Sequence, residues 1–288
     1  MCIIVTMKEQ KTTYCDLHTH SVYSDGTYTP AELIEKAEQL GLSAVALTDH
    51  NTVAGLAEFA QAAKGKRVQA VAGIEISTDY GDRELHILGL FIKPDTYARL
   101  MPPIEEMLSR REQSNLLLLE NLHKADFEIS YEEVKNRTQA KSFNRAHVAA
   151  VMVEKGYADS IAEAFDRYLA VGKGFYFGPK RLDVFETIAF LKELGAVAVL
   201  AHPFLQFNEK ELRVFLGKAK AYGLDGMETM YSAYTAETTK KAQAIAAEFG
   251  LKESGGSDFH GENRPGVALG TGRGTLAVPT EFFEKLKA

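Results

Sequence analysis

The stretch Asp16-Leu17-His18-Thr19-His20-Ser21-Val22-Tyr23-Ser24-Asp25-Gly26 places two histidines and a carboxylate directly after a short β-prone segment that ends at Tyr14-Cys15. On an extended backbone, residues i and i+2 point to the same side, so His18 and His20 can present both imidazoles to one point beyond a strand end. Imidazole binds zinc, iron, nickel or copper, whereas a carboxylate such as Asp25 favours harder, oxygen-binding ions. The stretch therefore predicts a metal site with mixed ligands, and the alternative is a pair of surface histidines in a turn.

Polar residues follow or interrupt most of the other predicted strands as well. Short runs with the apolar pattern of buried strands cover residues 43–48, 68–74, 84–91, 196–201, 226–229 and 252–256. The segments between them predict helices over residues 30–40, 53–64, 184–194, 209–222 and 236–249. Repeated strand and helix units with reactive residues at strand ends favour an α/β barrel, whose active site lies at the carboxyl end of the strands. A doubly wound open sheet is the alternative.

The stretch 95–177 interrupts this alternation with helical sequence. Pro102 and Pro103 are predicted to start a helix that runs to about residue 124, and shorter helices are expected at 131–138, 144–155 and 160–168. We therefore predict two parts, a metal-binding barrel formed by residues 12–94 and 178–288, and a helical cap inserted at residues 95–177.

Nine reactive side chains lie at or just beyond the predicted strand ends: His18, His20, Asp25, His50, Glu75, His86, His202, Asp258 and His260. Six of the eight histidines of the chain are among them. A random distribution would scatter histidines over helices and loops, as is the case for His123 and His147. The coincidence predicts a site for more than one metal ion.

The composition limits the class of protein and its partners. The chain has 288 residues, of which 45% are hydrophobic and 25% charged, and these are ordinary values for a globular protein. Neither a membrane span nor a secretion signal is visible, and the two cysteines, Cys2 and Cys15, form no disulfide framework, so we expect a soluble cytoplasmic protein. The net charge of −6 argues against binding of duplex nucleic acid and leaves short or terminal polyanions open.

The order of these residues resembles the PHP (polymerase and histidinol phosphatase) family of metal-dependent phosphoesterases. The motifs, from Asp16 to about Gly270, are His18-x-His20 with Ser24-Asp25-Gly26, Thr48-Asp49-His50, Gly73-Ile74-Glu75, the isolated His86, Ala201-His202-Pro203 and Ser257-Asp258-x-His260. The insertion after His86 is similar to that of the stand-alone bacterial branch, which includes 3′,5′-nucleoside bisphosphate phosphatases and an AMP-cleaving relative. The resemblance implies a distorted seven-stranded, TIM-like (β/α) barrel with an inserted helical cap.

The resemblance also implies three metal positions that share one mouth. The implied ligands are His18, His20, Glu75 and Asp258 for the first ion, Asp25, His50 and His260 for the second, and Glu75, His86 and His202 for the third. Glu75 would then bridge two ions. Many family members carry a histidine in place of Asp25, and the carboxylate shifts the second position toward manganese or magnesium. We expect two or three divalent ions, with manganese, iron or zinc ahead of magnesium.

The expected chemistry is hydrolysis of a phosphate ester. Clustered divalent ions neutralise the phosphate dianion and lower the pKa of a bound water toward about 7, so that hydroxide attacks at neutral pH. Asp49 and His202 are alternative proton donors. Family relatives carry a similar Arg-x-His element facing the metals, so Arg145 and His147 of the cap are expected substrate contacts. Further expected contacts are Lys180 and Arg181, in the return loop from the cap, as phosphate partners, and Ser77 beside Glu75.

The function expected from the sequence is that of a metal-dependent phosphatase of small metabolites. Nucleotides are the foremost substrates, either a 3′,5′-nucleoside bisphosphate or a 5′-monophosphate. Two other enzyme activities would use the same metals, namely 5′-3′ exonuclease activity on short RNA and hydrolysis of histidinol phosphate. A non-catalytic, metal-binding regulatory module is the alternative from another class. The oligomeric state is not specified by the sequence.

Overall fold

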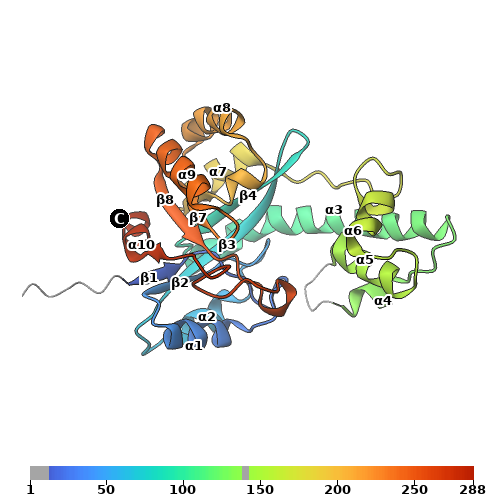
Figure 1. Cartoon of the computed structure of the whole chain (residues 1–288), viewed down its shortest axis with the longest axis horizontal. Coiled ribbons are helices and arrows are strands. Elements are labelled where there is room, and N and C mark those ends of the chain that lie inside the picture. Colours follow the sequence, from blue (N-terminus) through green and yellow to red (C-terminus); the bar gives the residue numbers. More distant parts are fainter. Residues whose placement is uncertain (1–12, 138–142) are drawn as a thin grey trace, which may run out of the picture.

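One nine-stranded sheet curls into a nearly closed barrel in the computed structural model, which describes residues 13–137 and 143–288 (Figure 1). Cys2 lies outside the described residues. The strands around the barrel are β1 (Tyr14–Asp16), β2 (Ala44–Leu47), β3 (Gln69–Tyr80), β4 (Arg83–Leu90), β6 (Val197–Leu200), β7 (Gly226–Tyr231) and β8 (Lys252–Gly256). Two short strands extend the sheet, because β5 (Leu182–Asp183) pairs with β3 and β9 (Val278–Pro279) pairs with β1.

The barrel closes between its first and last main strands. The backbone nitrogen of Leu17, just after β1, donates a hydrogen bond of 3.1 Å to the carbonyl oxygen of Gly255 in β8. A Cβ atom at Gly256 would lie 2.4 Å from the Cβ of His18, so only glycine permits this approach of the two edges. The predicted seven-stranded barrel is therefore confirmed, and the open doubly wound sheet is excluded.

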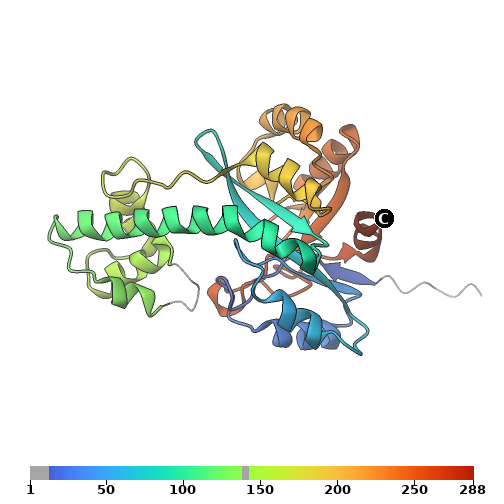
Figure 2. The ribbon, with the colours of Figure 1, turned by 180° about the vertical axis from the view of Figure 1, so that it is seen from behind.

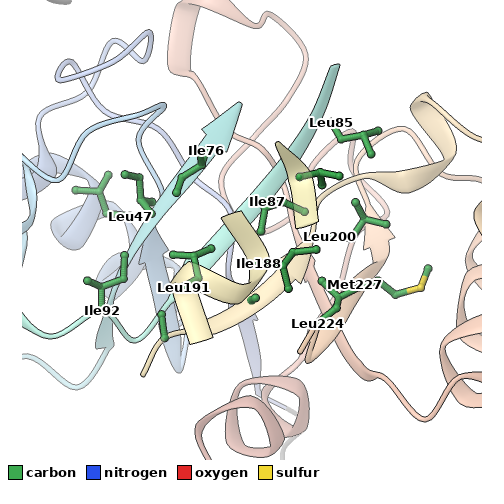
Figure 3. Packing of buried hydrophobic residues seen from close by; sticks show 14 of the residues in the cluster. Leu47, Ile76, Leu85, Ile87, Ile92, Ile188, Leu191, Leu200, Leu224 and Met227 are labelled. Carbon is green, nitrogen blue, oxygen red and sulfur yellow. The ribbon is translucent and has the colours of Figure 1, made fainter. Parts of the chain in front are cut away.

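Helices pack around the outside of the barrel, namely α1 (Pro30–Leu40), α2 (Leu56–Ala62), α7 (Val184–Glu193), α8 (Glu209–Ala219), α9 (Ala236–Glu248) and α10 (Thr280–Lys287). In α1, the side chain of Thr29 accepts a hydrogen bond from the nitrogen of Glu32, and Gly41 ends the helix with φ of 72°. Ile188 and Leu191 of α7 lie in the same buried cluster as Ile87 and Leu200 of the sheet (Figure 3). Complete burial of such a side chain contributes about 1.5 to 3 kcal/mol. Helix α10 was not predicted.

Strand β4 differs from the other barrel strands because it runs antiparallel to both of its neighbours, β3 and β6. Its first residues therefore lie at the barrel end where the parallel strands finish, and this brings His86 to that end. Strand β3 continues to Tyr80 as one arm of the β3–β4 hairpin. The prediction that Glu75 lies at a strand end was therefore wrong, since it lies within β3, opposite His50 in an isolated β-bridge.

The insertion forms a second lobe around α3 (Tyr97–His123), α4 (Tyr131–Lys135), α5 (Arg145–Glu154), α6 (Ile161–Ala164) and a π-helical turn (Phe165–Leu169) (Figure 2). Helix α3 belongs to both lobes. Leu100, Ile104 and Met107 pack in the barrel cluster, whereas Leu118 and Leu122 pack in a separate cap cluster.

The start of α3 was predicted wrongly. Pro102 and Pro103 lie inside the helix, which already begins at Tyr97. The complete burial of Leu100 and Ile104 in the barrel cluster stabilises helical turns on both sides of the prolines, which outweighs the lost backbone donors. No helix in the two described segments is both long and apolar enough to cross a bilayer.

Candidate metal centre

The barrel mouth gathers all nine side chains that the sequence suggested as metal ligands. They come from the segments just after β1, β2, β6 and β8, from within β3 and β4, and from the loop that holds Asp25. Their ligand atoms form four overlapping groups within which all atoms lie within 4.8 Å of one another: His20, Asp25, His50 and His260; His18, Glu75 and His202; His18, His20 and Asp258; His50, Glu75 and His86. Residues separated by more than 200 positions thus face one point.

Glu75 lies at the centre of the cluster, and its two oxygens face different histidines. Its Oε2 atom lies 3.2 Å from His18 Nε2, 3.3 Å from His20 Nε2 and 3.1 Å from His50 Nδ1. Its Oε1 atom lies 2.8 Å from His86 Nδ1 and 3.2 Å from His202 Nε2. A carboxylate with oxygens directed at two ligand sets has the geometry needed to bridge two cations.

Two aspartates complete the cluster on the side of β8 and of the Asp25 loop. Asp258 Oδ1 lies 3.2 Å from His20 Nε2 and 3.6 Å from His18 Nε2. Asp25 Oδ1 lies 3.3 Å from His260 Nε2, and Asp25 Oδ2 lies 3.9 Å from His50 Nε2. These groups correspond closely to the first and second implied positions, except that His20 also approaches Asp25 at 3.8 Å.

The cluster leaves many buried polar atoms without hydrogen-bond partners. Of the buried side-chain nitrogen and oxygen atoms in the described residues, eight make no hydrogen bond, and seven of these belong to the cluster: His18 Nε2, His20 Nδ1 and Nε2, Asp25 Oδ1, His50 Nδ1, Glu75 Oε2 and His202 Nδ1. An unsatisfied buried polar atom costs about 1 to 3 kcal/mol, so such a concentration calls for a ligand. Divalent cations satisfy imidazole nitrogens and carboxylate oxygens together, and the residues present therefore fit a metal centre.

Burial and mutual charge set the protonation of these groups. Burial opposes ionisation of Glu75, but the surrounding histidines outweigh it and hold the pKa of this carboxyl well below its usual range. Burial lowers the pKa of His50 to about 4, which keeps its imidazole neutral and able to bind a cation. Burial also disfavours the charged form of His86, but Glu75 and Glu84 outweigh this effect and raise the pKa of His86 to about 10. A cation that binds His86 would therefore release a proton.

Glu228 of β7 holds two of the candidate ligands, and sequence reasoning did not single it out. His18 Nδ1 donates a hydrogen bond of 3.0 Å to Glu228 Oε1, which leaves His18 Nε2 free to bind a cation. The backbone nitrogen of His202 donates to Glu228 Oε2 at 2.7 Å. The signal in the sequence was a lone carboxylate in the otherwise apolar start of a buried strand.

A second supporting network, also unrecognised in the sequence, fixes Asp258. Arg264 donates from Nη1 to Asp258 Oδ2 and from Nη2 to the Tyr231 hydroxyl at 2.7 Å. The Tyr231 hydroxyl donates to the same Asp258 oxygen at 2.9 Å. Oδ1 of Asp258 is thereby left to face the histidines. Asp258 has φ of 56° and His202 has φ of 31°, two left-handed backbone conformations in which residues other than glycine are rarely found.

The two alternative proton donors occupy different places. Asp49 is buried, and it accepts hydrogen bonds from the Ser21 nitrogen and hydroxyl at 2.7 and 2.6 Å and from the Ser24 hydroxyl at 2.6 Å. These bonds assign Asp49 to the support of the loop that carries Asp25. His202 directs Nε2 toward Glu75 at 3.2 Å, as a ligand would.

A cavity of about 540 Å³ opens over the cluster between barrel and cap. Asp25, His50 and His86 line it on the barrel side. The predicted contacts Ser77 and His147 also line it. His147 Nδ1 accepts a hydrogen bond of 3.0 Å from the Asn144 nitrogen, so the neutral ring carries its proton on Nε2. Burial lowers the pKa of His147 and favours this neutral form.

An adjoining cavity of about 260 Å³ contains the predicted contact Arg145. Its guanidinium lies 4.3 Å from the ring centroid of Tyr176 and donates to the Leu169 carbonyl at 3.0 Å. Lys180, which was also predicted to contact substrate, is exposed and lines neither of these two cavities. The next residue, Arg181, was also expected to contact phosphate, and it lines the second cavity.

Comparisons with known proteins agree with this arrangement. The PHP domain model matches residues 16–180. The chain is 34% identical over 247 residues to a 5′-3′ exoribonuclease of Haemophilus influenzae, which covers 85% of this chain and 89% of that protein. It is 31% identical over 278 residues to a 3′,5′-nucleoside bisphosphate phosphatase of Chromobacterium violaceum, with coverage of 95% and 96%. A solved structure from Bifidobacterium adolescentis, described as a proposed metal-dependent phosphoesterase, has a TM-score of 0.79 at 28% identity and covers 95% of both chains.

Proposed function

Because this chain belongs to the PHP domain family of metal-dependent phosphoesterases, we propose that it hydrolyses phosphate esters of nucleotides at the cluster around Glu75. The proposed substrates are 3′,5′-nucleoside bisphosphates or 5′-monophosphates. The observation that carries the proposal is the Glu75 carboxylate, whose two oxygens face three histidines and two histidines, respectively. This geometry suits a centre with two or more cations, which is the arrangement that phosphate-ester hydrolysis uses.

Divalent ions bound by the cluster would neutralise the charge of the phosphate and supply an ionised water at neutral pH. The chain itself holds the ligands in place. Glu228 fixes the ring of His18, and Arg264 fixes the carboxylate of Asp258. Ligands held in this way need not reorganise during the reaction, which lowers its barrier. Complete burial of His18 and His20 keeps bulk water away from the floor of the site.

The rim of the cavity would orient the nucleotide. His147 offers an Nε2–H donor from the cap, and Ser77 offers its hydroxyl beside the pair of hydrogen bonds that it makes with Asn51. Arg145 would contact a more distant part of the substrate from the second cavity. Two of these three contacts, His147 and Arg145, belong to the insertion, and Ser77 belongs to β3 of the barrel. We propose that the insertion contributes most of the substrate selection while the barrel carries the metals.

A second candidate function is 5′-3′ cleavage of short RNA. The second cavity adjoins the first and shares Asn51, Ser77, Glu84, Arg111 and Asn144 with it, so it offers space for groups beyond one nucleotide. The relative from Haemophilus influenzae bears the name of this activity. The net charge of −6 favours a short strand over a duplex.

A substrate panel together with elemental analysis tests the proposal. Protein purified without chelator is expected to carry two or three ions of manganese, iron or zinc per chain and to release phosphate from adenosine 3′,5′-bisphosphate or adenosine 5′-monophosphate. A 5′-phosphorylated oligoribonucleotide tests the second candidate, and histidinol phosphate tests the alternative phosphatase. Fewer than one ion per chain under metal-replete conditions, or no hydrolysis of any nucleotide, would refute the proposal.

A further inference from the structure

Arg111 of α3 lies where the two cavities meet, and it lines both of them. Within residues 13–137 and 143–288, no hydrogen bond or ion pair joins its guanidinium to another group. Burial lowers the pKa of Arg111, and this effect outweighs the nearby charges of Glu84 and Asp25, which favour the charged form without bonding to it. A partly buried cation without a bonded partner is costly unless an anion joins it.

The other charged groups around the second cavity are already engaged. Arg181 donates to Asp79 Oδ1 at 3.0 Å and to Glu84 Oε2 at 2.6 Å. The other oxygen of Glu84 faces His86 Nε2 at 3.4 Å. Arg145 lies on the ring of Tyr176 and donates from Nη1 to the Leu169 carbonyl at 3.0 Å, so only part of its guanidinium remains available to a substrate. The second cavity is thus lined by three arginines, Arg111, Arg145 and Arg181, and one glutamate, Glu84. Of these arginines, Arg111 is the one whose guanidinium makes no hydrogen bond to another described residue.

We propose that Arg111 is the centre of a second anion site, which binds the phosphoryl group of the substrate that is not hydrolysed. The proposal rests on the proposed function, since the first phosphoryl group lies at the cluster around Glu75. A guanidinium binds two oxygens of one phosphate through parallel N–H donors, and Arg111 has all of its donors available. Arg145 lines the same cavity and adds positive charge there.

The two proposed substrates that would use this site share one chemical feature. A nucleoside 3′,5′-bisphosphate and the 5′-phosphorylated end of an RNA each present a ribose with phosphates on both its 3′ and its 5′ oxygen. Whichever of the two phosphates is cleaved, the other needs a partner. A site between the metal centre and the cap therefore selects doubly phosphorylated nucleotides over monophosphates.

The test measures how much affinity one phosphate adds when the cluster around Glu75 holds no metal. Full-length protein in excess chelator, which prevents hydrolysis and leaves Arg111 as the proposed phosphate partner, is titrated calorimetrically with adenosine, adenosine 3′-monophosphate and adenosine 5′-monophosphate. In the unaltered chain the better monophosphate is expected to bind about 10- to 150-fold more tightly than adenosine, as a charge-assisted contact provides. Arg111→Gln is expected to abolish this gain, and Arg111→Lys to restore part of it. A 5′-phosphorylated diadenylate shows whether an RNA end uses the same site.

Arg110→Gln is the matched control, because Arg110 is the neighbouring arginine on α3 and its exposed side chain pairs with Glu106. This variant should keep the full gain. A gain that persists in Arg111→Gln, or a gain that is absent from the unaltered chain, overturns the proposal. Hydrolysis of p-nitrophenyl phosphate by the metal-loaded protein tests the proposed function separately. If that hydrolysis is absent while the gain and its loss are observed, the anion site stands and the proposed function fails.

Discussion

Replacing Glu228 by glutamine tests whether the support of the ligands governs metal binding. Both oxygens of Glu228 accept hydrogen bonds from N–H groups, one from the ring of His18 and one from the backbone of His202. An amide of the same shape can accept with its oxygen alone, so either orientation sets its NH₂ group against a donor. Glu228→Gln thus leaves one buried N–H unpaired in a group that is fully buried.

The magnitude follows from this count. One unpaired buried donor costs about 1 to 3 kcal/mol. Loss of the outer partner of a ligating histidine lowers metal affinity by about 10- to 100-fold, which corresponds to about 1.4 to 2.7 kcal/mol. The free-energy cost of the unpaired donor and the expected loss in metal-binding free energy thus cover similar ranges. If Glu228 holds His18 and His202 in position, most of this cost should be seen as weaker metal binding. Competition of the protein with a chelator of known affinity, followed by elemental analysis, measures this change.

Glu253→Gln provides the matched control. Glu253 is a half-buried carboxylate of the neighbouring strand β8 that accepts a hydrogen bond of 2.8 Å from the Thr229 hydroxyl. Its amide can accept that hydrogen bond as well, and metal affinity should stay within twofold of the unaltered protein. If Glu228→Gln also binds metal within twofold, Glu228 does not position the ligands and the reasoning fails.

The contacts of Glu75, Arg264, Arg145 and Glu84 predict the effects of four further substitutions. Glu75→Gln should remove at least one ion per chain, as measured by elemental analysis, and should reduce the rate of phosphate release more than alanine at any single histidine of the cluster. A histidine variant with a lower rate than Glu75→Gln would contradict the bridging role. Arg264→Gln should weaken metal binding by about 10- to 100-fold by freeing Asp258, and unchanged affinity in the chelator assay would exclude this support. Arg145→Ala should lower kcat/KM for the preferred nucleotide by about 10- to 150-fold with little effect on p-nitrophenyl phosphate; equal losses on both would place it on the transferred phosphate. Burial opposes ionisation of Glu84, but His86 and Arg181 outweigh this effect and lower the pKa of its carboxyl to about 2. The ionised carboxylate therefore stabilises the folded protein above about pH 4.5, and this contribution is lost as the pH falls toward 2. In acid-unfolding measurements, Glu84→Gln should lack the loss of stability over this pH range.

The ligands could be predicted from the sequence because a polar residue after a buried strand has a local cause. His18, His20 and His50 each follow such a strand, and parallel strands deliver their ends to one side of a barrel. Glu75 was identified by its motif but was predicted at the end of a strand, whereas it lies within β3. The extent of β3 depends on pairing with β4, which is a contact between strands and not a property of either segment.

The groups around the ligands could not be predicted, because their roles depend on tertiary contacts. Glu228 stands out as a lone carboxylate in a buried strand, but its partner His18 is 210 residues away in the chain, so the sequence does not identify which ligand it holds. Arg264 has no such signal. Lys180 and Arg181 were both expected at the site, and of the two only Arg181 lines either of the two cavities. Consecutive side chains of an extended segment point to opposite sides, and the sequence alone did not show which of the two faces the cavity.

Helix α3 fixes the distance between the metal centre and Arg111, and this distance limits the substrates that can reach both. Its Leu100 to Met107 portion is anchored in the barrel core, and its portion from Leu118 onward is anchored in the cap core, so both ends of the intervening stretch are fixed. Arg111 lies in that stretch, at a constant rise of about 1.5 Å per residue from either anchor. The distance between the metal centre and the Arg111 guanidinium is therefore fixed by the helix. Insertion of a helical turn into α3 between Met107 and Arg111 is expected to change the distance between the two phosphates that a substrate must have.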